Sequence, residues 1–461
     1  MLLNSVFNRF VQESPAAVMV RGLLEHVLTP ESVDALFEEH ADSQYTRALL
    51  FSQTVELMGQ VVCGIYPSAN AAYQKQRERF TVSRTAVYDK LNGVEPQVSA
   101  ALTRQTAASL TAVIRELGGA LPDLLPGYRV KILDGNCLAK TEHRVQELRT
   151  IAAGPLPGKS LVVLDPALML AIDVFPCEDG HTQERALLDQ VLATVEANDV
   201  WIEDRNFCTL GFLFGVAARD ACFVVRQHQN LPWEAVTELE YAGESEDVEV
   251  WEQKVRLNNP ETGETLIVRR LELRLPTPTR DGDRVIHVLT NLPARVAGAS
   301  LVADLYRKRW KIESLFQVLE STLESEQTRL GYPKAALFAF CVSLVAYNVL
   351  AVVRAALRAV HGREVVEETV STYYLTDEVK GVYRGMMIAI PGAEWEQFRD
   401  LTVAQLAVQL KELASNARLL AYQRHPRGPK KPRPERIHHK DKPHVSTARL
   451  LATRDKKRRA P

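Results

Sequence analysis

Between residues 127 and 226, one pattern restricts the possible folds more than any other feature of the chain. Short apolar runs rich in β-branched residues alternate with turns and with two stretches of helical periodicity. The strand-like runs are Arg129–Leu133, Ser160–Leu164, Ala167–Phe175, Val200–Glu203 and Cys222–Arg226, and the helical stretches are Thr182–Asn198 and Leu210–Arg219. Only Asp165-Pro166 separates the second and third runs, which predicts a hairpin, whereas the later alternation of strand and helix predicts parallel strands. The pattern therefore indicates an α/β protein with a mixed sheet and flanking helices.

A second β-rich segment interrupts this alternation at about residues 229–284. Hydrophobic and charged residues alternate in Val248–Leu257 and in Thr265–Leu275, with turn residues between the two runs. This predicts an inserted antiparallel β unit. Val285–Thr290 then resumes the sheet, and a long charged helix follows from Leu301 to about Ser325.

Both ends of the chain lack the strand pattern. A length of 461 residues exceeds what one core normally organises, and we expect a helical N-terminal domain over 1–124 and a helical C-terminal region over 331–420. The apolar segment Ala335–Val353 is as long as a membrane span, but Ser343, Tyr347 and Asn348 interrupt it. A buried core helix is therefore the better interpretation, and no membrane contact is expected.

Charge is distributed unevenly. Residues 421–461 hold 14 Lys and Arg against 3 Asp and Glu, whereas residues 1–420 hold 42 basic and 54 acidic residues. Several prolines interrupt the basic segment, which predicts a flexible tail that either binds polyanions or only keeps the protein soluble. The six cysteines form no CxxC pair and the N-terminus lacks a signal-peptide pattern, so we expect a cytoplasmic protein.

One segment of the N-terminal domain has the pattern of a DNA-recognition helix. Ser83 is followed by a short run with basic and polar residues on one side, and Asn92-Gly93 ends it. Helix-turn-helix modules place such a helix in the major groove. An ordinary amphipathic helix gives the same local pattern, so both interpretations stay open.

Two aspartates follow apolar runs of the predicted sheet. Asp134 comes directly after Val130–Leu133, and Asp204 comes directly after Val200–Glu203. Two carboxylates at neighbouring strand ends would suit a hard cation. An aspartate in this position is also a common turn former, as Asp165 before Pro166 illustrates.

The long charged helix carries the third set of residues. Five polar side chains fall within an arc of roughly 80° on one helix face, namely Tyr306, Arg309, Glu313, Gln317 and Glu320. A solvated surface gives a similar stripe. The pattern alone does not decide between a solvated surface and a site.

These segments together resemble the DDE transposases of bacterial insertion sequences, in the group named for insertion sequence four. That group carries a Tyr-x2-Arg-x3-Glu-x6-Lys signature, and Tyr306, Arg309 and Glu313 match its first three positions, while Glu320 stands in place of the lysine. The resemblance includes Asp134-Gly135-Asn136, Asp204-Arg205-Asn206-Phe207 and the β-rich insertion, and it covers roughly residues 125–350.

The resemblance implies an RNase H-like catalytic domain over 125–330, with Asp134, Asp204 and Glu313 binding two Mg²⁺ ions, or Mn²⁺ as a substitute. It further implies that Tyr306 and Arg309 contact DNA. Trp233 resembles the aromatic residue that some relatives use to hold a flipped base, although ordinary packing is an equal interpretation and Trp251 is a rival.

The function implied is transposition of an insertion sequence by metal-dependent strand cleavage and strand transfer, in a cut-and-paste reaction. The expected partners are double-stranded DNA, as terminal inverted repeats and target DNA, and a second copy of the chain on that DNA. Glu320 at the lysine position motivates an alternative, a DNA-binding protein derived from a transposase that has lost catalysis. A third alternative, a globular protein whose acidic residues are only caps and surface charges, requires three motifs to coincide by chance.

Overall fold

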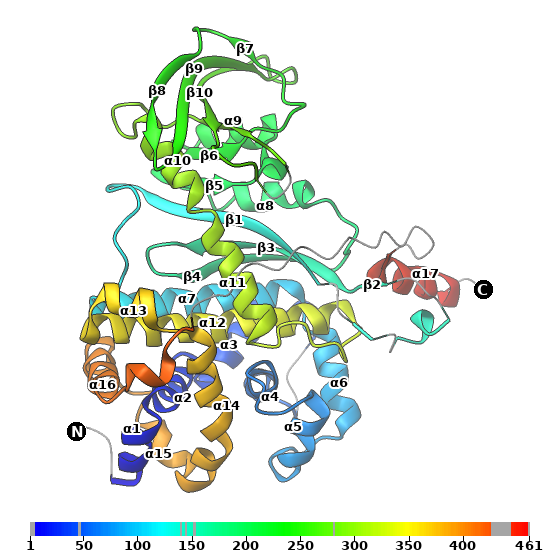
Figure 1. Ribbon diagram of the computed structural model, residues 1–461. Coiled ribbons are helices and arrows are strands. Elements are labelled where there is room, and N and C mark those ends of the chain that lie inside the picture. The colour runs from blue at the N-terminus through cyan, green and yellow to red at the C-terminus, as the bar shows by residue number, and fades with distance from the viewer. Residues whose placement is uncertain are drawn as a thin grey trace.

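The computed structural model shows a twisted sheet lying on a broad layer of helices, with the β-rich insertion at the far end of the sheet (Figure 1). It describes residues 5–44, 48–138, 141–142, 145–150, 154–279, 282–425 and 444–459. The sheet has ten strands, in the order β4-β3-β1-β5-β6-β11-β10-β9-β7, with β8 paired to β9.

The first half of the sheet is the mixed arrangement that the sequence predicts. It consists of β1 (Arg129–Leu138), β3 (Gly158–Asp165), β4 (Leu170–Cys177), β5 (Asp199–Glu203) and β6 (Cys222–Arg226). The strand β3 runs antiparallel to both β1 and β4, whereas β5 runs parallel to β1 and β6 runs parallel to β5. The prediction of a mixed sheet with flanking helices is confirmed.

The insertion extends this same sheet. Its strands are β7 (Glu234–Ala235), β8 (Glu240–Ser245), β9 (Val248–Asn258) and β10 (Thr265–Arg274), followed by β11 (Val285–Thr290). All of their pairings are antiparallel, and β11 pairs with β6 at the edge of the mixed half. The predicted antiparallel unit is therefore present, and it lengthens the sheet by edge-to-edge pairing.

One long helix, α12 (Pro333–His361), forms the centre of the helical layer. It packs against α7 (Pro96–Leu117) and against β4, and its most apolar window is entirely buried. Among the described helices it alone is long and apolar enough to cross a membrane. Asn348 explains why a polar residue occurs in this helix, because its amide makes two hydrogen bonds of 2.8 and 2.9 Å with the backbone of Ala171 on the edge strand β4.

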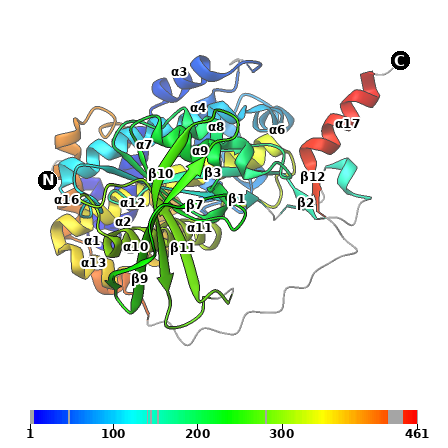
Figure 2. The same cartoon turned by 90° about the horizontal axis from the view of Figure 1, so that it is seen from above.

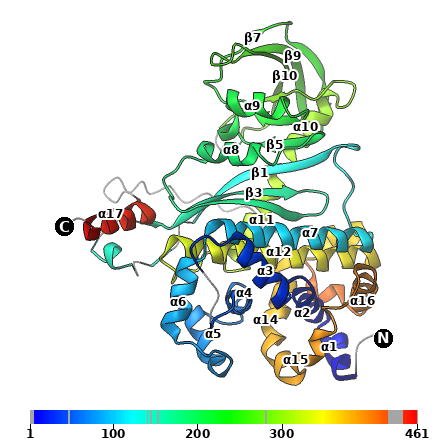
Figure 3. The same ribbon diagram turned by 180° about the vertical axis from the view of Figure 1, so that it is seen from behind.

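Helices from both ends of the chain surround α12 and share one hydrophobic core with it (Figure 3). The N-terminal ones are α1 (Asn8–Glu13), α2 (Pro15–Val27), α3 (Pro30–His40), α4 (Phe51–Val62), α5 (Ala69–Lys75), α6 (Arg84–Gly93) and α7. The C-terminal ones are α13 (Arg363–Thr369), α14 (Thr372–Ala389), α15 (Gly392–Glu396) and α16 (Val403–Ser415). The segments 1–124 and 331–420 thus pack as one helical layer, although the sequence pattern indicates a separate N-terminal module.

Two predicted helices differ from the structure. The segment 182–198 contains only a 3-10 turn at Glu184–Leu187 and the short α8 (Leu188–Leu192). The long charged helix is divided into α10 (Ala299–Arg307) and α11 (Trp310–Ser321). The backbone tightens at the junction, where the amides of Arg309 and Ile312 bond to carbonyls three residues back.

The end of the chain is also more ordered than a flexible tail. The short strand β12 (Val445–Ser446) pairs in parallel with β2 (Pro155–Leu156), and α17 (Thr447–Arg459) projects away from the rest of the molecule (Figure 2). Ion pairs of Arg449 with Asp179 and of Arg454 with Glu147 attach this helix to the region of the mixed sheet. The remainder of the predicted tail, residues 426–443, lies outside the described residues.

Candidate active site

Asp134 and Asp204 lie beside each other on adjacent parallel strands. The last paired residues of β1 and β5 are Leu133 and Glu203, and each aspartate is the next residue along its strand. The prediction that Asp134 ends its strand is wrong, because β1 continues to Leu138 and Asp134 still pairs with Val162 of β3. Only the pairing of β1 with β5 ends at this level. The two aspartates therefore lie where these strands stop pairing, and both side chains are partly exposed.

Strand alternation fixes the face on which the aspartates lie. Ile132 and Ile202 belong to the core that includes α12, whereas Leu133 and Trp201 belong to the core on the opposite face. Because successive side chains point to opposite faces, Asp134 and Asp204 face the same side as the Ile residues. The helices α10 and α11 cover this side of the sheet (Figure 1).

Arg309, at the junction of α10 and α11, brings the acidic residues together. Its Nη1 lies 2.9 Å from Oδ2 of Asp134, and its Nη2 lies 2.7 Å from Oε1 of Glu313, one helical turn away. The guanidinium is nearly buried, while 39% of the Glu313 side chain remains exposed. Tyr306, on the last turn of α10, is buried next to this cluster. The structure thus joins three of the six predicted site residues, Asp134, Tyr306 and Glu313, around a fourth, Arg309, with Asp204 as their neighbour.

The electrostatics of the cluster follow from burial and from charge crowding. Burial raises the pKa of Asp134 to about 6, Arg309 and the Gly135 amide oppose this rise, and the nearby Asp204 and Glu313 carboxylates add to it. Burial also raises the pKa of Tyr306 to about 12, and the Asp204 carboxylate contributes. Tyr306 is therefore a neutral hydroxyl at physiological pH, while Asp134 titrates within the range of cellular conditions.

The donor set suits a hard divalent cation. Carboxylate oxygens are the ligands that Mg²⁺ prefers, and crowded carboxylates bind a cation because it relieves their mutual repulsion. In the part of the chain that the structure describes, no three His, Cys, Asp or Glu side chains are close enough to hold a metal ion. Arg309 lies between Asp134 and Glu313 and supplies the positive charge there. The residues fit such an ion by their chemistry, provided that Glu313 turns toward the aspartates.

Gly135 permits an acidic residue to pack against β1 on the face opposite to Asp134. A Cβ at Gly135 would lie 2.2 Å from a carboxylate oxygen of Glu184, so any larger residue would displace that side chain. Glu184 accepts a hydrogen bond from the side-chain amide of Asn206. The motifs around Asp134 and Asp204 are thereby tied together through Glu184, which the sequence analysis missed because it lies in the segment predicted as a continuous helix.

Arg226 is a second residue that the sequence analysis missed. The register of β5 with β6 pairs Glu203 with Val225, so Arg226 continues the level of Asp134 and Asp204 across the sheet. Counting residues along the predicted strands Val200–Glu203 and Cys222–Arg226 would have identified it.

The predicted tryptophan contact is not brought to the acidic cluster. Trp233 is 37% exposed, and the guanidinium carbon of Arg270 lies 4.6 Å from its ring centre. Arg270 precedes Leu271, which belongs to the core on the side of Asp134, so Arg270 itself points to the other face of the sheet. Trp251 makes a similar contact with Arg274 at 4.2 Å and an edge contact with Tyr241.

The helix α6 has the predicted serine cap but lacks the predicted basic surface. The Ser83 hydroxyl accepts a hydrogen bond from the amide of Ala86 at 3.3 Å. Lys90, however, is buried with its ammonium 3.7 Å from the ring centre of Phe37. Arg84 is thus the basic residue that α6 exposes, and the role of this helix in DNA binding stays a prediction.

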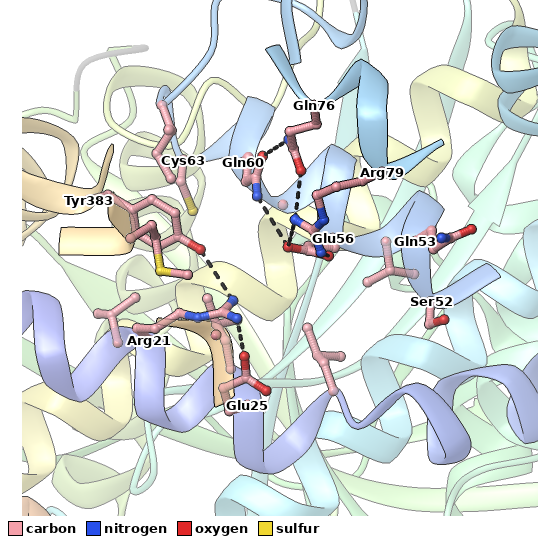
Figure 4. A pocket seen from close by; sticks show the side chains of 18 of the residues that line it. Arg21, Glu25, Ser52, Gln53, Glu56, Gln60, Cys63, Gln76, Arg79 and Tyr383 are labelled. Atoms are coloured by element: carbon pink, nitrogen blue, oxygen red, sulfur yellow. Dashed lines mark hydrogen bonds and ion pairs between the residues drawn. The ribbon is translucent and has the colours of Figure 1, made fainter. Parts of the chain in front are cut away.

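A cavity of about 1070 Å³ lies in the helical layer, between α2, α4 and α14 (Figure 4). None of the predicted site residues lines it. Its polar groups are largely paired with one another, as in the contacts of Arg21 with Glu25 and of Arg79 with Glu56. The cavity is therefore separate from the acidic cluster.

Comparison with known proteins finds a family match in the part of the chain that holds most of these residues. Residues 158–349 match the family model of the transposase DDE domain. This part of the chain is thus similar to the transposase DDE domain. The matched segment includes Asp204, Tyr306, Arg309 and Glu313, while Asp134 lies before it on β1, between the matched strands β3 and β5.

Two further comparisons give no match or only a distant one. No curated protein matches the sequence significantly. Among solved structures, the chain is similar to a cryo-EM structure of piggyBac transposase in a synaptic complex with hairpin DNA, with 8% identity and a TM-score of 0.40. That alignment covers 88% of this chain and 86% of the other.

Proposed function

We propose that this protein is an insertion-sequence transposase of the insertion-sequence-four group that cleaves DNA strands and joins them to target DNA. The observation that carries the proposal is the meeting of Asp134, Arg309 and Glu313, with Asp204 at the same level of the sheet, inside a region that includes the transposase DDE domain. A surface stripe on a solvated helix would not be buried against two carboxylates from the sheet.

In this proposal, Asp134, Asp204 and Glu313 hold two Mg²⁺ ions, or Mn²⁺ in their place. The ions would activate the attacking water or 3′-hydroxyl, stabilise the leaving oxygen and neutralise charge on the scissile phosphate. Arg309 already contacts two of the three carboxylates. On binding of metal and DNA, we propose that its planar guanidinium turns from these carboxylates to phosphate oxygens, whose geometry it matches equally well.

Tyr306 has a positioning role in the same proposal. Its raised pKa keeps the hydroxyl protonated, so it can donate a hydrogen bond to a phosphate oxygen of the DNA strand near the cut. A phenolate in this position would repel both the DNA and the carboxylates.

The partners follow from the reaction. The substrates are double-stranded DNA as terminal inverted repeats and as target, and we assign recognition of the repeats to the N-terminal helices 1–124. Joining two ends in concert requires two active sites, so we propose a homodimer assembled on DNA. We place the reaction in the bacterial cytoplasm.

A cut-and-paste pathway with hairpinned ends is a finer part of the proposal. It rests on the β-rich insertion and on Trp233, which is partly exposed and stacked with Arg270. Denaturing gels of cleaved element ends test it: hairpin products support the pathway and should disappear in Trp233→Ala, whereas nicked ends without hairpins would refute it.

The decisive experiment measures Mg²⁺-dependent cleavage of DNA carrying the flanking element ends. Asp134→Ala, Asp204→Ala and Glu313→Ala should each abolish cleavage while DNA binding persists, and EDTA should do the same in the intact protein. Asp189→Ala removes an exposed carboxylate from α8 and serves as the matched control. Binding by the intact protein without cleavage would instead indicate the decayed DNA-binding protein, for which Glu320 at the signature lysine position is the sequence signal.

A further inference from the structure

A row of three charged residues crosses the sheet at the proposed active site. The registers Leu133 with Glu203 and Glu203 with Val225 place the next residues, Asp134, Asp204 and Arg226, side by side on β1, β5 and β6. Arg226 therefore continues the line of the two aspartates toward the insertion. Its side chain is 18% exposed, which leaves its guanidinium accessible from one side.

The partner of Arg226 comes from the insertion. Nη2 of Arg226 lies 2.6 Å from Oδ2 of Asp283, which sits in the loop between β10 and β11. The loop holds this aspartate in place, because the Asp283 amide donates to Oγ1 of Thr279 at 3.1 Å and the Thr279 amide donates to the Asp283 carbonyl at 2.8 Å. These two bonds to Thr279 thus orient the residue whose carboxylate meets Arg226.

A second arginine acts on the same carboxylate. Arg205 directly follows Asp204, and its charge, together with the hydrogen bond and charge of Arg226, lowers the pKa of Asp283. Asp283 therefore lies in the field of Arg226 on β6 and of Arg205, which directly follows Asp204 in the chain. A carboxylate and a phosphodiester present similar pairs of oxygen atoms to a guanidinium, so a site that holds the first also suits the second.

The ion pair with Asp283 is easy to exchange. Over a third of the Asp283 side chain is exposed, and ion pairs at such accessible positions add little to stability. A DNA phosphate that replaces Asp283 would thus have to break only a weak ion pair. It would also lie close to the carboxylates to which the proposed function assigns cleavage of the scissile bond.

We propose that Arg226 binds a backbone phosphate next to the scissile position, and that Asp283 occupies this phosphate site until DNA displaces it. This inference rests on the proposed function, because it assumes that DNA binds across Asp134 and Asp204. It assigns to the insertion a restraint on DNA binding, exerted through a single carboxylate.

The test compares Arg226→Gln, Asp283→Asn and the double variant by measuring the Kd for duplex DNA carrying the element ends over a range of salt concentrations. Arg226→Gln should weaken binding by about tenfold, the effect of losing one charged hydrogen-bonded contact, and should flatten the slope of log K against log salt by about 0.9. Asp283→Asn should tighten binding by about three- to tenfold at low salt. The double variant should bind like Arg226→Gln, because Asp283 acts only through the arginine.

Controls separate this site from general charge effects. Arg256→Gln breaks a comparable arginine pair with Glu234 on the far side of the insertion and should leave affinity and slope nearly unchanged. Arg226→Lys keeps the charge, so its affinity for DNA should lie between those of the wild type and of Arg226→Gln. Thermal unfolding checks that each variant is folded. Unchanged binding in Arg226→Gln, or tighter binding from Asp283→Asn in the Arg226→Gln background, would overturn the inference while the proposed function stands. Absence of DNA binding by the intact protein would overturn both.

Discussion

The guanidinium of Arg309 lies 2.9 Å from the carboxylate of Asp134, although the two residues are 175 positions apart in the chain. The contact links the junction of α10 and α11 to the middle of β1. The same guanidinium binds Glu313 at 2.7 Å, so one cation balances two acidic residues that would otherwise repel each other.

Arg309→Ala should reduce DNA cleavage by about 10²- to 10³-fold, the usual effect of removing a preorganised group that stabilises charge. Arg309→Lys should be almost as inactive, because an ammonium lacks the planar fork that reaches both carboxylates. Single-turnover cleavage gives the rate, and calorimetric Mn²⁺ titration should show that metal still binds. Arg307→Ala, which breaks the neighbouring pairs with Glu246 and Asp304, is the matched control; equal losses in both variants would contradict a specific role of Arg309.

Asp134→Asn should abolish cleavage and yet make the metal-free protein more stable at pH 7. Burial raises the folded-state pKa of Asp134 from 3.8 to about 6, so the ionised carboxylate is unfavourable in the fold. The destabilisation grows as pH rises from about 4 to 6 and then stays constant, with an upper limit of about 3 kcal/mol. Urea unfolding from pH 4 to 8 checks this: the advantage of Asp134→Asn should vanish near pH 4, and an advantage independent of pH would exclude the explanation.

Lys90→Met should raise the free energy of unfolding by about 1–3 kcal/mol at pH 7. Burial lowers the pKa of Lys90 from 10.5 to about 8, and its ammonium has no hydrogen-bond partner. Since a lowered lysine pKa destabilises the fold below pH 8, the wild type should regain stability as pH rises from 8 to 10.5. Lys411→Met, at an exposed position of α16, should change stability little; a loss of stability in Lys90→Met would show that the contact with Phe37 is the larger effect.

Gly119→Ala should destabilise the protein by about 2–4 kcal/mol. A Cβ at Gly119 would lie 2.1 Å from the carbonyl oxygen of Ala355 on α12, and backbone there cannot move aside easily. The Gly119 carbonyl also accepts a hydrogen bond from Arg358 at 2.7 Å. Gly211→Ala, in open space on α9, should instead be neutral or stabilising by up to about 1 kcal/mol. Equal thermal midpoints for the two variants would disprove the close contact.

Much of the fold was predictable because its strands have clear local signals. The runs before Asp134 and Asp204 identify β1 and β5, and the rule that strand and helix alternate in parallel sheets places the two aspartates together. The break between α10 and α11 was not predictable, because helical periodicity continues through Arg309 and only the tertiary contact with Asp134 distinguishes that position.

The remaining differences also come from contacts between distant segments. Glu184 packs beside the two aspartate motifs because of Gly135 and Asn206, neither of which is near it in the sequence. The sequence predicts that Lys90 belongs to the basic surface of its helix, whereas the structure packs its ammonium on the ring of Phe37. The helix α17 has a polar sequence that composition alone identifies with a flexible tail, and its order depends on β2 and on Asp179.

The pairing of β12 with β2 changes how the basic end of the chain can meet DNA. On one side of residues 426–443, Gln423 bridges to Val370 and the Arg424 amide bonds to Thr369 on the helical layer. On the other side, Val445 and Ser446 pair with β2, and α17 is attached through Arg449 to Asp179 and through Arg454 to Glu147. DNA that reaches this end of the sheet would thus meet a basic helix held in place beside it, with two of its arginines already paired with carboxylates.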